Sequence, residues 1–430
     1  MSGLRAHDPE LLKLGLTLPG VIERGEVVTS MPSLGLLWLA AVTPDRHEVA
    51  YYEAQDSSHV PDAVIDCDIV AISALTAQAF EAYRVAKQLR ELGITVVMGG
   101  LHATVVPEEV ERHVDAVFVG EAERTWPLAL ADFENGKLKR RYSGRELGPV
   151  DISSLPSPRY DLLAGGEWNR FPLQTTRGCP WRCDFCASSI MLDLPYRKRT
   201  PQAVERDLQV IKSVAKRPFI ELADDNTFVD HKWGLVLCDV LKSERVQWFT
   251  ETDISVADDE TLMKRLRESR CRQLLIGLEG TSPDELNGLE LRANFKQRRA
   301  GDYMNAVRRI QDHGVTVNGC FVLGLDHQSP DIFARIHDFV MNAPLFEVQI
   351  TVMTPFPGTP LYSRLLKEKR ILIPGNWDLC TLFDVNFVPA QMTVDELRSG
   401  YYSLVEKLYS SENISHRRRA FLERLWQLHA

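Results

Sequence analysis

The sequence predicts an α/β protein with two parallel-sheet units: an N-terminal doubly wound sheet over residues 1–140 and a partial (β/α)6 barrel of the TIM type over residues 166–375. In both halves, short apolar runs that suit buried strands alternate with longer segments of helical periodicity. Between them, residues 141–165 are rich in Pro, Gly and Ser and are expected to be a linker. Residues 376–430 are expected to form a short helical extension.

The N-terminal half contains six predicted elements after its opening apolar run, Leu12–Leu18. Leu34–Val42 is a helix candidate, and Ala77–Leu92 has helical periodicity that stops at Gly93, a common helix terminator. Four short runs are expected to form strands: His47–Glu53, Ile69–Ser73, Ile94–Met98 and Ala116–Val119.

Small and polar residues follow several of these strands. Ligands of open parallel sheets bind beyond the carboxyl ends of the strands, so these residues are candidates for binding. The pair Gly99-Gly100 would let the backbone approach a large flat ring without interference from Cβ atoms. A nucleotide would suit the sheet too, but the sequence has no G-x-G-x-x-G or P-loop motif. The candidates are Ser73, Leu75, Thr76, Gly99, Gly100, His102, Gly120 and Glu121.

The second half contains six predicted strands with helices between them. Pro201–Ala215 is a helix with Thr200 as its cap, and Asp258–Ser269 is another. Active sites of such barrels lie at the C-terminal ends of the strands. The strands are expected at Phe171–Thr175, Phe219–Leu222, Trp248–Thr252, Gln273–Leu278, Val315–Leu323 and Phe346–Thr351.

Cys179, Cys183 and Cys186 follow the first barrel strand with the spacing Cys-x3-Cys-x2-Cys. Structural zinc needs four ligands, whereas an iron–sulfur cluster on three cysteines leaves one iron open for an outside ligand. A zinc site completed by His231 or Cys238 is an alternative, although neither lies in a paired zinc motif. Three unrelated core cysteines are another, although charged residues stand between them. The spacing therefore favours a cluster, and with it an enzyme.

Composition narrows the class of protein. The chain has 430 residues, of which 44% are hydrophobic and 25% charged, and a net charge of −9 that gives no case for nucleic acid as a partner. No apolar stretch reaches the length of a membrane span, and the N-terminus lacks the apolar core of a signal peptide. The other five cysteines are scattered, as in a reduced cytoplasmic protein. The C-terminal stripe of Phe421, Leu425 and Leu428 is expected to dock on the barrel rather than on a membrane.

Taken together, these motifs resemble the cobalamin (B12)-binding-domain radical SAM enzyme family. In the first half the resemblance lies in IVAISALTAQAFEAYRVAKQLRELG, VVMGGLHATVVPEEV and VFVGEAERTW. In the second half it lies in TTRGCPWRCDFC, ADDNTFVD, LLIGLEGTS, GCFVLGLDHQSP and TPFPGTPLY. The end, VNFVPAQMTVDELRSGYYSLVEKLYS, is similar to an extension found in one branch of the family.

The resemblance implies a [4Fe–4S] cluster on the three cysteines, with the open iron chelating S-adenosylmethionine. It places Phe185 against the adenine, Asp224 and Asp225 near the methionine ammonium, and Glu279 near the ribose. Local alternatives stay open: packing of the loop for Phe185, a turn or cap for the aspartates, and a surface turn for Glu279.

The resemblance also implies cobalamin as a cofactor. Many B12 domains supply an axial histidine from Asp-x-His-x-x-Gly, but here the run from Asp45 to Ala50 lacks the glycine and stands before the second strand. We therefore expect neither His47 nor His102 to ligate cobalt, and His102 to contact corrin amides or phosphate.

The implied reaction is methylation of an unactivated carbon of a small or lipid-like metabolite by a 5′-deoxyadenosyl radical and methylcobalamin. A radical cyclase or ring-contracting enzyme without methyl transfer is the alternative, and a B12 or redox sensor with a relict barrel is a third reading. An external electron donor of the flavodoxin or ferredoxin type is expected as a partner.

Overall fold

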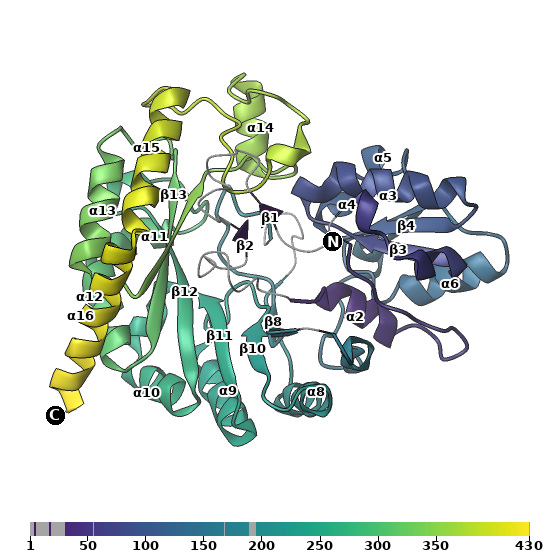
Figure 1. Cartoon of the computed structure of the whole chain (residues 1–430), viewed down its shortest axis with the longest axis horizontal. Coiled ribbons are helices and arrows are strands. Elements are labelled where there is room, and N and C mark those ends of the chain that lie inside the picture. Colours follow the sequence, from purple (N-terminus) through teal and green to yellow (C-terminus); the bar gives the residue numbers. More distant parts are fainter. Residues whose placement is uncertain are drawn as a thin grey trace.

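Two parallel sheets lie side by side in the computed structural model, the N-terminal one coloured purple to blue and the second one teal to green in Figure 1. The structure describes residues 4–5, 17–18, 31–54, 56–166, 168–188, 195–343 and 345–429.

The first sheet has four parallel strands in chain order. Its first three strands confirm the predictions at Ile69, Ile94 and Ala116 to within a residue or two. The fourth falls inside the segment that we predicted to be a linker, because three residues, Arg-Tyr-Ser, have too weak an apolar signal to reveal a strand. The strands are β3 (Ile69–Ser73), β4 (Thr95–Gly99), β5 (Ala116–Val119) and β6 (Arg141–Ser143).

Helices cover both faces of this sheet, as expected for a doubly wound fold. One apolar cluster joins it to α3 (Ala79–Glu91), α4 (Leu101–Val105) and α5 (Pro107–Val110), and a second joins it to α6 (Trp126–Glu134). The helix predicted at Leu34 is confirmed as α2 (Leu34–Ala41).

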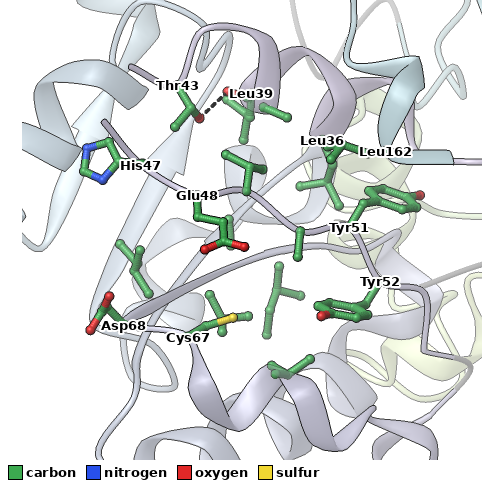
Figure 2. Close-up of a pocket in the computed structure, with 18 of the residues that line it drawn as sticks. Leu36, Leu39, Thr43, His47, Glu48, Tyr51, Tyr52, Cys67, Asp68 and Leu162 are labelled. Carbon is green, nitrogen blue, oxygen red and sulfur yellow. Dashed lines mark hydrogen bonds between the residues drawn. The ribbon is translucent and has the colours of Figure 1, made fainter. Parts of the chain in front are cut away.

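The strand predicted at His47–Glu53 is wrong. Its first residue lies in a turn in which the His47 amide donates to the Pro44 carbonyl at 3.0 Å, and none of the segment pairs with a strand in the described part of the chain. A groove of about 560 Å³ separates it from β3, whose residues are all only half-buried. Figure 2 shows Tyr51 and Tyr52 near one end of the groove, with Cys67 closer to β3. A strand needs a hydrogen-bonded neighbour, and here the groove takes that place.

The predicted run at Leu12–Leu18 lies outside the described residues, apart from its last two. These form β2 (Thr17–Leu18), which pairs antiparallel with β1 (Leu4–Arg5).

The second sheet is an open barrel of six parallel strands whose spatial order follows the chain. All six predicted strands are present: β7 (Phe171–Leu173), β10 (Phe219–Leu222), β11 (Gln247–Thr252), β12 (Cys271–Glu279), β13 (Thr316–Leu323) and β14 (Glu347–Val352). The barrel helices are α8 (Pro201–Val214), α9 (His231–Glu244), α10 (Glu260–Glu268), α12 (Tyr303–Asp312) and α13 (Ile332–Asn342).

The caps of the two predicted barrel helices follow from their sequences. The Thr200 side chain accepts a hydrogen bond from the amide of Ala203 at 3.3 Å, and Pro201 occupies the first turn of α8. The Asp259 carboxylate accepts a hydrogen bond from the amide of Leu262 at 2.9 Å and so caps the N-terminus of α10.

After β14 the chain forms α14 (Pro360–Lys367), which lies within the range predicted for the barrel, and then the two helices of the predicted extension, α15 (Val394–Leu408) and α16 (Ser411–His429). Phe421 of α16 docks on the barrel as predicted, with its ring centre 5.2 Å from that of Phe346. Leu425 is half-buried, whereas Leu428 is 49% exposed. The described helices include none with the length and apolarity that a membrane span requires.

Candidate active site between the two sheets

A cavity of about 300 Å³ lies where the carboxyl ends of the two sheets face each other. From the first sheet come residues at the carboxyl ends of β3, β4 and β5, and the glycines Gly100 and Gly120 that follow β4 and β5. From the barrel side come Gln174, Arg177, Ala223 and Asp225. The structure thus brings six of the predicted residues to one cavity: Ser73, Gly99, Gly100, Gly120, Glu121 and Asp225.

Gly100 has a conformational reason to be glycine. Its φ is +98°, in the region that other residues rarely adopt, and a Cβ there would lie 3.4 Å from the Ala74 carbonyl oxygen. Gly99 has a negative φ, and its Cβ would make an ordinary contact with Phe118. The turn therefore explains Gly100, while Gly99 leaves the cavity wall there without a side chain.

Three of the candidates do not line the cavity. Leu75 and Thr76 lie in the turn before α3, one exposed and one buried. The ring of His102 is fully buried under α3: its Nε2 lies 2.9 Å from the Tyr83 hydroxyl, and its edge faces Trp377. Burial lowers the pKa of His102 to about 4, so the ring is neutral. The structure therefore does not bring His102 to the corrin contacts that we predicted.

Glu121 ties the first sheet to the barrel. Its carboxylate pairs with Arg177 and, at 2.9 Å, with Arg197, and it accepts the amide of Val150 at 2.9 Å. Burial alone would raise the pKa of Glu121, but the hydrogen bond from Arg197 and the charge of Arg177 lower it overall. The sequence did not reveal this role, because the two arginine partners are 56 and 76 residues away.

Arg177 stands immediately before the cysteine loop, in the short pair of β8 (Thr176–Arg177) and β9 (Arg197–Lys198). It also pairs with Glu123 at 2.8 Å, and its guanidinium lies 4.9 Å from the ring centre of Trp38. The start of the cysteine loop is therefore fixed to the end of β5.

The three cysteines are close enough to influence one another electrostatically. Burial raises the pKa of Cys179 to about 12 and raises that of Cys183, and the thiol of Cys186 adds to both shifts. Cys179 and Cys186 are half-buried, so an outside ligand can reach them. Within the described ranges, no three His, Cys, Asp or Glu side chains are grouped tightly enough for a single ion. Three neighbouring thiols on an accessible loop fit a cluster, whose irons bind separate thiolates.

A second loop supports the cysteines from behind. The amide of Asp184 donates to the Leu289 carbonyl at 2.9 Å, and the amide of Leu291 donates to the Arg182 carbonyl at 2.9 Å. Phe185 is half-buried and packs against the barrel core. This packing is the local alternative that the sequence left open for Phe185.

The two aspartates after β10 have different environments. Asp224 is buried, and its carboxylate accepts the amides of Thr175 at 2.7 Å and Thr176 at 2.9 Å. Asp225 is half-buried, lines the cavity and accepts the amide of Gly178 at 2.7 Å. Only Asp225 is therefore placed to meet a cation in the cavity, while Asp224 holds the strand end.

Asn226 is a site residue that the sequence did not reveal. Its side-chain nitrogen lies 3.9 Å from the Cys179 sulfur and donates to the Asp253 carboxylate at 2.8 Å. Trp181, inside the cysteine loop, donates to the same carboxylate at 2.9 Å. The position of Asn226 directly after Asp225 was the signal in the sequence that could have identified it as a site residue.

Glu279 ends β12 with a φ of +64° and is buried. Its carboxylate lies 2.8 Å from the ammonium of Lys296, in α11 (Phe295–Arg299), which also donates to the Gly277 carbonyl at 2.8 Å. Burial lowers the pKa of Lys296, but the charge of Glu279 outweighs it and raises the pKa overall. Backbone strain at a left-handed residue other than glycine costs about 1–3 kcal/mol. Such strain favours a role for Glu279 in the site over the alternative of a surface turn.

Comparison with known families identifies three matching regions in the chain. Residues 21–130 match the B12 binding domain, residues 173–340 the Radical SAM superfamily, and residues 359–429 a domain of unknown function, DUF4070.

Individual relatives extend over nearly the whole chain. Bacteriochlorophyllide d C-12(1)-methyltransferase of Chlorobaculum tepidum is 25% identical over 402 residues, covering 92% of this chain and 86% of the relative. Hopanoid C-2 methylase of Rhodopseudomonas palustris is 23% identical, covering 82% and 67%. Among solved structures, the cobalamin-dependent S-adenosylmethionine radical enzyme OxsB, with aqua-cobalamin bound, superposes with a TM-score of 0.68 at 13% identity over 93% of this chain and 70% of OxsB.

The two domain matches occur in one chain, and their strand ends face each other across one cavity. The protein therefore belongs to the cobalamin-binding radical SAM enzymes, whose cofactors are a [4Fe–4S] cluster, S-adenosylmethionine and cobalamin.

Proposed function

We propose that the protein is a C-methyltransferase that acts on an unactivated carbon of a small molecule. The observation that carries the proposal is the shared cavity, because it places the strand ends of the B12 domain directly opposite Asp225 and the start of the cysteine loop. The names of the Chlorobaculum and Rhodopseudomonas relatives support methyl transfer.

The two cavities of the first domain together suit a ring with a long tail. The cavity at the strand ends and the groove beside β3 share a wall, and ligand sites of several hundred Å³ are typical of cofactors. We expect the ring over Gly99 and Gly100, and the nucleotide tail along the groove. The shared residues are Leu36, Leu39, Ala71, Ile72, Ser73 and Trp126.

We expect no protein nitrogen on the cobalt. None of the described residues that line the strand-end cavity is a histidine. His47 lines only the groove, with its Nε2 3.3 Å from the Glu134 carboxylate. The cobalt(II) form should therefore show no axial nitrogen splitting in spin resonance, and His47→Ala should leave the spectrum unchanged.

On the barrel side, the loop of three cysteines would hold the cluster. Asp225 would accept the methionine ammonium, and Glu279 the ribose hydroxyls. When bound, these cofactors supply a 5′-deoxyadenosyl radical and a transferable methyl group. The buried pairs of Arg177 and Lys296 would keep the loop and the β12 end in position. Reduction requires an external electron donor, for which a flavodoxin or ferredoxin is our proposal.

The test uses anaerobically reconstituted protein with reductant, cobalamin and S-adenosylmethionine. We expect 5′-deoxyadenosine and S-adenosylhomocysteine, and a product heavier by one methyl group when a substrate is supplied. Cys183→Ala should lose the cluster absorbance and 5′-deoxyadenosine, whereas Cys238→Ala, in the barrel core, should keep both. A substrate that is converted without gaining a methyl group would favour a cyclase or ring-contracting enzyme instead.

A further inference from the structure

The inner face of the barrel sheet carries several polar side chains beside Phe249 and Leu275, whereas its outer face is largely apolar. Side chains alternate between the two faces along each strand. Ile220, Trp248, Leu274, Val317 and Val348 point outward and are buried in the core under the helices. The residues that alternate with them point inward: Glu221, Glu251, Asn318, Cys320 and Gln349.

Among the described residues, Glu251 is the inner-face strand carboxylate without a counter-ion. Glu221 pairs with Arg170 at 2.7 Å, and Glu279 pairs with Lys296 at 2.8 Å. The carboxylate of Glu251 has no hydrogen bond or ion pair with any residue that the structure describes. Its side chain is exposed to solvent, while desolvation by the surrounding barrel wall and then repulsion from Glu221, Asp225 and Glu279 raise its pKa to about 7.

Two amides on the same face also have unmatched acceptors. Asn318 is 5% exposed and Gln349 7%, and the side-chain oxygen of each has no partner in the described part of the chain. Glu251, Leu275 and Asn318 are register neighbours on three strands, and Cys320 and Gln349 are neighbours one layer nearer the strand ends. Buried acceptors are normally satisfied, so acceptors left open on one face indicate a ligand that donates hydrogen bonds.

This polar layer lies next to the cofactor loops. The Cys320 thiol, between the two acids, is within electrostatic reach of both Glu251 and Glu279. A molecule held on Glu251 and Gln349 therefore lies below the proposed S-adenosylmethionine contacts, where a substrate must be for hydrogen abstraction.

We infer that Glu251, Asn318 and Gln349 bind the substrate, and that the substrate is a polar small molecule with a cationic, hydrogen-bond-donating group such as an amine, amidine or guanidine. The inference rests on the proposed function for the position of the substrate. It narrows the expected class of small or lipid-like metabolites to the polar ones. A purely apolar lipid would leave one carboxylate and two amide oxygens without partners.

The test titrates the reconstituted holoenzyme with benzamidine, with the neutral benzamide and with benzoate, by calorimetry or ligand-observed NMR. We expect benzamidine to bind wild-type protein more tightly than either analogue, and Glu251→Gln to weaken it at least fivefold. Glu260→Gln, on the outside of the barrel, should have no effect. Iron content and S-adenosylmethionine affinity report correct folding of each variant.

Gln349→Met gives an independent readout. It removes an unmatched buried acceptor at nearly constant volume, so we expect a higher Tm together with weaker benzamidine binding. A lower Tm with unchanged benzamidine affinity would show that Gln349 has an internal structural partner and would overturn its role.

The two proposals fail in different ways. If benzoate binds as tightly as benzamidine, or if Glu251→Gln changes nothing, the substrate class is wrong while methyl transfer still stands. If the holoenzyme makes neither 5′-deoxyadenosine nor S-adenosylhomocysteine, the proposed function is wrong, and the benzamidine titration still decides whether the inner face binds cations.

Discussion

Arg177 and Glu121 offer the sharpest test of how the two halves are joined. We consider a double-mutant cycle with Arg177→Met and Glu121→Gln. The side chains are 10% and 5% exposed, so solvent screens the pair only weakly. Each partner also keeps a second contact, since Arg177 pairs with Glu123 at 2.8 Å and Glu121 with Arg197 at 2.9 Å.

These second contacts set the expected size of the effect. Removing one member of a buried ion pair costs about 3–5 kcal/mol when the other is left alone. Glu121→Gln leaves Arg177 paired with Glu123, so we expect the free energy of unfolding to fall by about 2 kcal/mol. Arg177→Met leaves the Glu123 carboxylate without its partner as well, so we expect the free energy of unfolding to fall by about 4 kcal/mol. The coupling energy should then be about 2 kcal/mol.

Urea unfolding of the reconstituted protein, followed by tryptophan fluorescence, measures the cycle from midpoints at an unchanged m-value. The exposed pair Arg46–Glu134, with side chains 53% and 36% exposed, is the control, and solvent screening should make its coupling energy much smaller than that of the buried pair. If the Arg177–Glu121 coupling is no larger than that of the control, the pair does not join the halves.

Three further predictions concern single residues. Asp225→Asn should weaken S-adenosylmethionine binding about tenfold in a titration with the cluster intact, whereas Asp224→Asn should lower the Tm without that loss, because its carboxylate holds backbone amides. The pKa of Glu251 in the folded protein is raised to about 7, so the protein loses stability as the pH rises from the ordinary pKa of a glutamate to about 7. In urea titrations, Glu251→Gln should therefore be more stable than wild type at pH 8, by about 1 kcal/mol after allowing for solvent access, and equally stable at pH 4.5. Gly100→Ala, at a φ of +98°, should cost about 1–3 kcal/mol, whereas Gly99→Ala should leave stability nearly unchanged and weaken cobalamin binding in a spectroscopic titration.

The strands were predictable because burial on both sides makes them nearly continuous apolar runs, as in Ile94–Met98. His47–Glu53 contains a shorter apolar and aromatic run, Val49–Tyr52, but a strand also needs a neighbour, and pattern alone does not supply one. Arg141–Ser143 shows the opposite case: it is paired by its position beside β5, with little help from its own side chains.

The site was predictable where a motif is local and not where it depends on distant partners. The cysteine spacing lies within eight residues and identified the loop at once. Lys296 is a lone lysine seventeen residues after Glu279, and only the fold shows that the two side chains meet. His102 followed a glycine pair and looked like a ligand residue, but the turn directs it into the core.

The tie between Arg177 and the end of β5 also bears on kinetics. Any separation of the halves wide enough to exchange a large ring at the strand ends would have to pull a buried guanidinium away from two carboxylates and from the face of Trp38. Such a separation would leave buried charges without partners, so we expect it to be slower than a catalytic cycle. We therefore expect cobalamin to stay with the protein through many turnovers, while S-adenosylmethionine and its fragments enter and leave without opening this contact.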